Sequence, residues 1–167
     1  SVNATDPAAH LSVQQVRDDF SKRARILDNI AKYQTVTLWF EHDLYDQLQL
    51  AEILHCLAAT GPTGLSLICI GDYPGVEPFH GLGNLTPSQL ATLWPTRQPV
   101  NEQQLMSGQR IWRALCAEDP GELAIIAARG VPSLPFMAPA LRRFCREFPH
   151  SDTGLTLTQW HLLTLVS

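Results

Sequence analysis

Long hydrophobic runs are missing from this sequence: no apolar stretch approaches the roughly 20 residues that a transmembrane helix needs, and no signal peptide is recognisable. A membrane-spanning protein is therefore not expected. Cysteine is scarce, and the four cysteines share no CxxC or other metal-type spacing. Each lies in an apolar run, so we expect free, mostly buried thiols in a reducing compartment, which makes the cytoplasm the expected location. These residues are Cys56, Cys69, Cys116 and Cys145.

The sequence also lacks the short motifs of common nucleotide-binding and hydrolytic sites. The GLG at residues 81–83 does not directly follow a strand pattern, and it lacks the spacing of Rossmann or P-loop glycines. No serine, cysteine or threonine stands in a nucleophile-elbow motif. Internal repeats and low-complexity segments are absent as well. The sequence therefore has none of these motifs to identify its function.

Charge is sparse and mostly negative. Charged residues make up 17% of the chain, and the formal net charge is −4 with a pI of about 5.8. A negative protein repels the phosphates of nucleic acids and anionic membranes, so direct nucleic-acid binding is not expected. A length of 167 residues with 45% hydrophobic residues suits one well-buried core and is short for two ordinary domains.

The first half of the chain has the pattern of a βαβ unit. Residues 35–40 are β-branched and aromatic, which predicts a buried strand. Helical spacing follows and ends near Gly61, and the apolar run at 65–71 predicts a second strand. Because the joints are short, the two strands are expected to be parallel, with a right-handed crossover.

Helices are predicted on both sides of this unit. Ser12 and Gln15 form a capping box for the first helix, and Thr86 supplies an N-cap after a long, turn-rich loop at 72–85. Apolar periodicity predicts helices at about 12–33 and 102–116, and shorter helices at 121–129 and 136–147.

These elements predict the α/β fold class. Residues 1–148 are expected to form a single α/β domain, with a small parallel sheet from the βαβ unit at 35–71, flanking helices and a helical C-terminal half. Residues 149–167 are expected to begin a further, helical tail.

Polar side chains gather where the first strand ends and the next helix begins. Asp43 can cap this helix, with Asp46 at its third position, and both carboxylates favour the positive end of the helix dipole. Capping alone therefore explains these two. Glu41 and His42 contribute nothing to capping, and the sequence leaves open whether the four residues form a chemical site or a structural polar seam.

A second polar group follows the other strand. Asp72 comes directly after it, and ligands of open parallel sheets bind outside the carboxyl ends of the strands. Neighbouring strands lie ~5 Å apart, so we expect Glu41, Asp43 and Asp72 to converge. Such a set of carboxylates suits Mg²⁺ or Mn²⁺ and predicts a catalytic group. Glu41 and Asp72 would be metal ligands or general bases, and His42 would carry protons.

Other side chains are candidates for contacts with a ligand at this mouth. Asp46 and Tyr73 lie beside the strand ends, His80 lies in the long loop, and Arg97 would bring a positive charge. A short basic run near His150 is more typical of a solvated helix face than of a phosphate site; it comprises Arg142, Arg143 and Arg146.

The run LWFEHDLYDQLQL resembles the signature of a bacterial family known only as a domain of unknown function, whose members are sometimes labelled sigma-factor-like. The similarity covers essentially residues 12–167 and continues through LSLICIGDYPGV, GLGNLTPSQLATLWPTRQPV, PSLPFMAPALRRFCREFP and TGLTLTQWHLLTLV. The last of these is similar to the family's entry into a helix–turn–helix-like tail. The resemblance implies a bacterial protein of this kinship, and it implies no reaction.

Two classes of function are therefore expected. The first is a ligand-binding, hydrolase or phosphoryl-transfer domain that takes a small-molecule or phosphate-containing ligand at the acidic strand ends. The second is a transcription-associated, sigma-factor-like module that binds DNA or polymerase, or else a non-catalytic interaction scaffold. The acidic balance of the chain counts against direct DNA binding.

Overall fold

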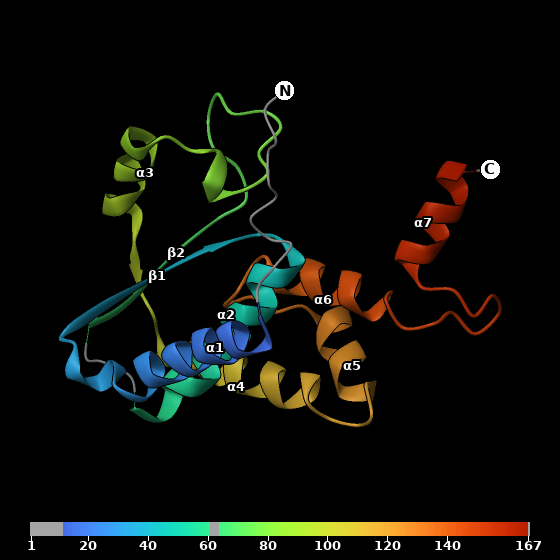
Figure 1. Ribbon diagram of the computed structural model, residues 1–167, viewed down its shortest axis with the longest axis horizontal. Helices are drawn as coiled ribbons and strands as arrows, with labels where there is room; N and C mark the ends of the chain where they lie inside the picture. The colour runs from blue at the N-terminus through green and yellow to red at the C-terminus, as the bar shows by residue number, and fades with distance from the viewer. Residues whose placement is uncertain (1–11, 61–63, 167) are drawn as a thin grey trace.

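The computed structural model describes residues 12–60 and 64–166 (Figure 1). Within these ranges the protein is an α/β structure with seven α-helices and one three-stranded sheet. The C-terminal half is mostly helical, as the sequence predicted. Gly61, the predicted end of the crossover helix, lies outside the described residues.

The sheet is built on the predicted βαβ unit. β1 (Thr35–Glu41) and β2 (Gly64–Ile70) are parallel, and α2 (Leu44–Thr60) connects them. β2 lies between β1 and β3 (Gln98–Pro99), a short antiparallel strand that the sequence pattern did not predict. β3 has a proline and no apolar alternation, so its pairing with β2 alone makes it a strand.

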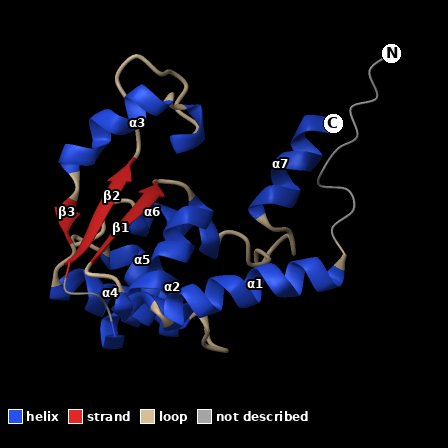
Figure 2. Cartoon of the chain, turned by 60° about the vertical axis from the view of Figure 1, so that its left-hand side comes forward, coloured by secondary structure: helices blue, strands red, loops and turns tan. Residues whose placement is uncertain are grey.

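One face of the sheet packs on α2 and on α4 (Glu102–Leu115), below the strands in Figure 2. Leu38 and Leu67 point to this face, where they meet Leu54 and Ile111 of the two helices. Alternate residues of a strand point to opposite faces, so apolar residues two apart supply this core. It is the main core of the domain.

The opposite face is covered by the long segment after β2 and by α3 (Pro87–Leu93). Trp39 and Ile68 point to this side, and they pack with Leu85 and Leu93 in a second, smaller cluster. A parallel sheet needs cover on both faces. Here a folded-back loop supplies part of that cover in place of a second crossover helix.

Burial of the strands is less complete than the sequence predicted. Leu67 and Ile68 are buried, whereas Leu38, Phe40 and Ile70 are only partly buried. The first two belong to β2, the central strand. β1 is an edge strand among the described residues, so its apolar side chains have neighbours on one side only.

The remaining helices follow the predicted order with small shifts at their ends. The α-helices are α1 (Val13–Asp28), α5 (Gly121–Arg129), α6 (Met137–Cys145) and α7 (Leu157–Val166). Short 3₁₀ turns are η1 (Ile30–Lys32), η2 (Leu82–Asn84) and η3 (Trp94–Thr96).

The two terminal helices contribute little to the core. Neither α1 nor α7 contains a buried residue, and α7 stands apart from the other helices at the end of a loop (Figure 1). The capping box of Ser12 and Gln15 is present. The predicted helix at 12–33 stops earlier, because Asn29 ends α1 and a 3₁₀ turn follows. In the part of the chain that the structure describes, no helix is long and apolar enough to cross a membrane.

The four cysteines are free thiols, but the prediction that they are mostly buried is wrong. Cys56 and Cys116 are exposed, and Cys69 and Cys145 are half-buried. Cys56 and Cys116 lie on the outer sides of α2 and at the end of α4, so an apolar stretch of helix does not bury every residue in it.

Candidate functional site

The backbone of Glu41 is tied to the first turns of α2. Its N–H donates to Asp46 Oδ2 at 2.7 Å, and its carbonyl oxygen accepts from Gln47 Nε2 at 2.6 Å. Gln47 is only 1% exposed and also contacts Cys69 Sγ at 3.3 Å. These bonds satisfy buried polar groups where the strand turns into the helix.

Asp43 caps α2. Its Oδ1 accepts the N–H of Asp46 at 2.9 Å, and its carbonyl oxygen accepts the N–H of Gln47 at 3.1 Å. Asp43 itself is exposed. Asp43 and Asp46 therefore both have structural roles, one as the cap and the other as the acceptor for Glu41, in agreement with the capping interpretation.

The carboxylate of Glu41 holds the loop after β2. Its Oε1 accepts the N–H of Leu82 at 2.8 Å, across 41 positions of sequence. The backbone of Gly81 packs so closely on this carboxylate that a β-carbon there would overlap it, and Gly81 has a φ of +138°. Glu41 thus holds the loop in place through one oxygen, while the other oxygen packs against Gly81.

His42 is placed differently from its neighbours. Its ring lies between Phe79, at 6.1 Å between ring centres, and Phe136, at 6.2 Å. Phe79 comes from the loop after β2, and Phe136 precedes α6. The Nδ1 atom of His42 is buried and has no hydrogen-bond partner among the described residues. In the described part of the chain, His55 within α2 is the other residue with such an atom, and it lies away from the strand ends.

The predicted site residues that follow β2 do not converge on one site. Asp72 is exposed, with no hydrogen bond or ion pair to the described residues. Tyr73 hydrogen-bonds Thr92 of α3 through its hydroxyl group at 3.0 Å, and its ring joins the apolar cluster under the loop. His80 is exposed, and its backbone N–H donates to Asn84.

Arg97 is at the other end of the sheet, so it does not bring a positive charge to the mouth. Its guanidinium carbon lies 4.4 Å from the ring centre of Trp94, and Nη1 donates to the Trp94 carbonyl at 2.8 Å. With Trp94 it lines a hollow of about 590 Å³ beside Thr35 and Gly64, the first residues of β1 and β2. The strands run away from this hollow toward Glu41.

The structure also does not gather the predicted metal ligands. Among the described residues, no group of three or more His, Cys, Asp or Glu side chains is placed to hold a metal ion. Glu41 binds the loop, Asp43 caps α2, and Asp72 points to solvent. The pairing of β1 with β2 puts Glu41 beside Ile70, so the strands are parallel neighbours as predicted, but the three carboxylates have separate surroundings.

The segment that contains β1, α2, β2 and the loop after β2 carries charge of one sign. The chain has no lysine or arginine between Lys32 and Arg97, and this interval holds six acidic residues. The acidic residues are Glu41, Asp43, Asp46, Glu52, Asp72 and Glu77. An anion at His42 would find no countercharge there, whereas a cation would be attracted.

Sequence reasoning found His42 but missed the groups that surround it. Gln47, Gly81, Phe79 and Phe136 were not predicted as part of the site. Phe136 is 94 positions from His42, and no local pattern signals that contact. Gly81 gave a weak signal of a close contact, because it is a glycine in a loop where no turn motif explains it.

The comparisons with known proteins do not identify the chain: no family model, no curated protein and no solved structure matches it. The resemblance to a bacterial family of unknown function therefore stays a prediction.

Proposed function

We propose that the protein is a ligand-binding α/β domain that takes a small amine-bearing cation at His42. The observation that carries this proposal is the buried Nδ1 of His42, which has no partner among the described residues at the carboxyl end of β1. Buried polar atoms are nearly always paired, so an unpaired one at a strand end marks a place for a ligand atom.

The surroundings of His42 fit an ammonium group. With its proton on Nε2, the imidazole accepts a hydrogen bond at Nδ1, and an ammonium group donates one. Phe79 and Phe136 present aromatic rings on two sides, and ring faces attract cations. Phosphate would lack all of these attractions, so phosphoryl transfer is disfavoured at this mouth.

The loop after β2 controls access to Nδ1. Because this atom is out of contact with solvent, a ligand reaches it only when a neighbouring group moves, and Phe79 on the loop is such a neighbour. The bond from Leu82 to Glu41 holds the closed position. Glu41 is therefore assigned a positioning role in the proposed binding site.

Thermal unfolding with three probes tests this function. Putrescine carries two ammonium groups, 1,4-butanediol has the same chain without charge, and inorganic phosphate has the opposite charge. Putrescine should raise the melting temperature and the other two should not, since a ligand that binds the native state stabilises it by mass action.

Two variants separate the site from general attraction to an acidic protein. His42→Leu should abolish the putrescine shift, while His161→Leu, on the exposed surface of α7, should keep it. The proposal fails if putrescine gives no shift, or if His42→Leu responds as the wild type does.

A second candidate function is an interaction module, the scaffold or transcription-associated alternative. It is favoured by the large apolar side chains that α1 and α7 expose, since exposed apolar side chains are typical of contact sites. These residues are Val13, Val16, Phe20, Ile26, Trp160, Leu162, Leu163, Leu165 and Val166. The net charge of −4 disfavours DNA as the partner.

Light scattering tests this alternative for the simplest partner, a second copy. A self-associating module should show a mass above 18.5 kDa as concentration rises, and the double variant Phe20→Ser, Leu165→Ser should return to the monomer mass. A wild type that stays monomeric at every concentration would count against self-association.

A further inference from the structure

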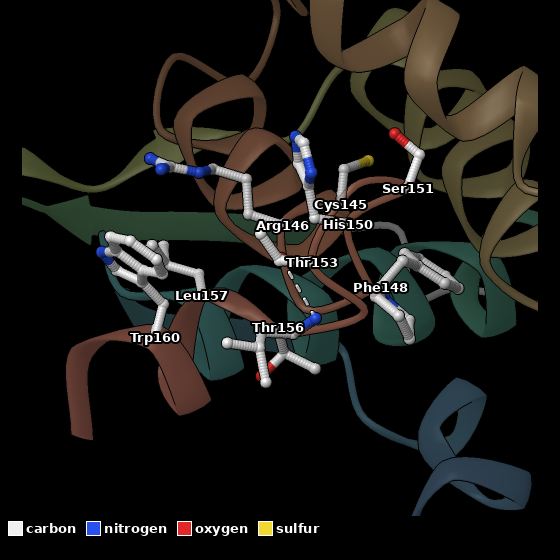
Figure 3. A pocket seen from close by; sticks show the side chains of 11 residues that line it. Cys145, Arg146, Phe148, His150, Ser151, Thr153, Thr156, Leu157 and Trp160 are labelled. Carbon is white, nitrogen blue, oxygen red and sulfur yellow. Dashed lines mark hydrogen bonds between the residues drawn. The ribbon is translucent and has the colours of Figure 1, made fainter. Parts of the chain in front are cut away.

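A cleft of about 520 Å³ lies between the end of α6 and the start of α7 (Figure 3). This volume falls within the range of small-molecule pockets, roughly 300–1,000 Å³. Its walls combine a cation, hydroxyl groups, an imidazole and flat rings, contributed by Arg146, Thr153, Thr156, Phe148, His150 and Trp160. It shares no lining residue with the mouth at His42 and is independent of the function proposed there.

Arg146 supplies an uncompensated positive charge to this cleft. Three arginines lie close together at the end of α6. Arg142 donates to the carbonyl oxygen of Ala127 at 3.0 Å, and Arg143 pairs with Glu147. The Arg146 side chain makes no hydrogen bond or ion pair with the described residues, although its carbonyl oxygen accepts from Leu157. Its guanidinium donors are therefore available to an anion.

His150 adds a second donor. Its Nδ1 accepts the backbone N–H of Asp152 at 3.2 Å, which places the proton of a neutral imidazole on Nε2. The carboxylate of Asp152 is 3.9 Å from the same Nδ1, too far for a hydrogen bond, so the backbone contact decides the tautomer. Nε2–H makes no hydrogen bond with the described residues and remains a donor.

Trp160 and Phe148 give the cleft its flat surfaces. Phe148 is held edge-on by Phe144, at 5.7 Å between ring centres. Trp160 is 54% exposed and stacks on no other ring among the described residues. In Figure 3 the guanidinium of Arg146 and the indole of Trp160 point to the same side of the cleft. A planar ring would stack on this indole.

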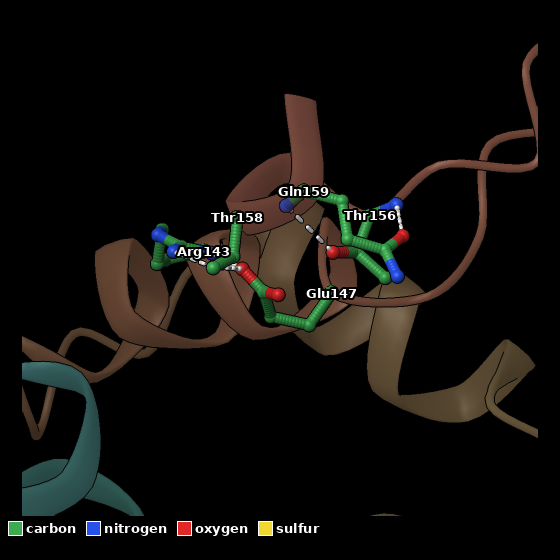
Figure 4. A network of polar contacts seen from close by, with 5 residues as sticks. All are labelled: Arg143, Glu147, Thr156, Thr158 and Gln159. Carbon is green, nitrogen blue, oxygen red and sulfur yellow. Dashed lines mark hydrogen bonds and ion pairs between the residues drawn. The ribbon is translucent and has the colours of Figure 1, made fainter. Parts of the chain in front are cut away.

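Although most of α7 stands apart from the other helices, polar contacts join its first residues to the end of α6, so the cleft is formed before any ligand enters. Glu147 accepts from Arg143 and from the Thr158 hydroxyl, the latter at 2.9 Å (Figure 4). Thr156 and Gln159 form a capping box at the start of α7, with N–H to side-chain distances of 2.9 and 3.1 Å. A pre-formed site avoids the entropic cost of ordering its walls.

We infer that this cleft binds an anion carried on a planar ring. Arg146 and the Nε2–H of His150 take the anionic group, and Trp160 stacks on the ring. Two classes of ligand have this chemistry, nucleoside phosphates and aromatic carboxylates. In either class, full affinity requires both the ring and the anionic group.

Isothermal titration calorimetry on the full chain tests the inference with AMP and benzoate as the two ligand types. AMP or benzoate should bind, and the tighter of the two identifies the class. For AMP, the separated halves adenosine and inorganic phosphate should bind at least about tenfold more weakly, because each makes only part of the contacts.

Single variants in the cleft test whether the ligand binds there. Arg146→Gln and Trp160→Leu should each weaken binding about tenfold or more, since a hydrogen bond to a charged group and a stacked ring are each of that magnitude. Arg113→Gln, which removes the same charge from the exposed surface of α4, should leave it unchanged. Circular dichroism of each variant confirms that it is folded.

The inference is overturned if neither AMP nor benzoate binds. It is also overturned if Arg146→Gln or Trp160→Leu binds the ligand as tightly as the wild type does. A third contradicting result is that benzoate does not bind and inorganic phosphate binds as tightly as AMP.

Discussion

Gly81 and the carboxylate of Glu41 are in such close contact that the structure has no room for a β-carbon at position 81. The same carboxylate accepts the N–H of Leu82 at 2.8 Å. Glycine also permits the φ of +138° that brings the loop down onto the strand end. The loop that closes over His42 thus depends on one glycine and one carboxylate.

Gly81→Ala should therefore destabilise the fold. An alanine adds both a forbidden φ and an overlap with Glu41, so we expect a loss of more than about 1 kcal/mol in the free energy of unfolding, measured in urea. Gly83→Ala is the matched control, because Gly83 has an ordinary φ and open space around it. Equal losses for the two variants would show that the loop is not held at Gly81.

The buried Gln47 should be as important for stability as Gly81. Gln47→Met keeps the length of the side chain but removes the amide donor to the carbonyl oxygen of Glu41, which leaves only the weak contact from Cys69 Sγ at 3.8 Å, so the cost should be about 1–3 kcal/mol. Gln49→Met, on the exposed side of α2, should change stability by less than about 0.5 kcal/mol. Urea unfolding compares them, and a cost for Gln47→Met as small as that of Gln49→Met would contradict the assigned role.

Variants of Asp43 distinguish a helix-capping role from a role in ligand binding. Asparagine caps helices about as well as aspartate, so Asp43→Asn should keep both stability and putrescine binding, while Asp43→Ala should lose about 0.5–2 kcal/mol of stability. The melting temperature with and without putrescine measures both effects. Loss of putrescine binding in a folded Asp43→Asn protein would return Asp43 to the functional site.

The α6–α7 contact should weaken in acid. The hydrogen bond from Arg143 holds the pKa of Glu147 below its ordinary value of 4.5, with help from Thr158. A lowered pKa in the folded state means that the contribution is complete above the unfolded value, near pH 4.5, and is lost as the pH falls through the folded value.

Hydrogen exchange of α7 amides over this pH range, corrected for intrinsic rates, measures the loss. Protection should drop in acid for the wild type, and Glu147→Gln should be equally protected on both sides of the transition. A wild type with pH-independent protection would contradict the role of this ion pair.

The thiols should react in an order set by their surroundings. Burial raises the pKa of Cys69 to about 11, so little thiolate forms at neutral pH, while Cys116 is exposed. With a chromogenic disulfide reagent at pH 7.5, Cys116 should be modified first and Cys69 last, as mass spectrometry would show. In unfolded protein the difference should vanish. A native Cys69 that reacts as fast as Cys116 would contradict its burial against Gln47.

Much of the fold could be predicted from the sequence because it is encoded locally. The apolar runs around Leu38 and Leu67 and the capping signals at Ser12 and Thr86 act over a few residues, and each produced the predicted strand or helix. β3 could not be predicted, because Pro99 has no strand propensity and pairs only through its position next to β2.

The candidate site was predictable only in its location. The strand-end rule led to Glu41 and His42, but the pattern cannot say that the Glu41 carboxylate is taken by Leu82 or that Phe136 covers His42. Arg97 was misplaced for the same reason, since the direction of a loop side chain depends on its tertiary neighbours, here Trp94.

The most direct measurement of the central claim is the ¹⁵N chemical shift of the His42 ring during a titration with putrescine. Nδ1 is the acceptor in the proposed complex, so its resonance should move with saturation behaviour, and 1,4-butanediol should leave it in place. The ring resonances of His161 serve as the internal control and should not saturate in the same way. A His42 Nδ1 resonance that stays fixed while putrescine is added in excess would contradict the assignment of His42 as the ligand-binding residue.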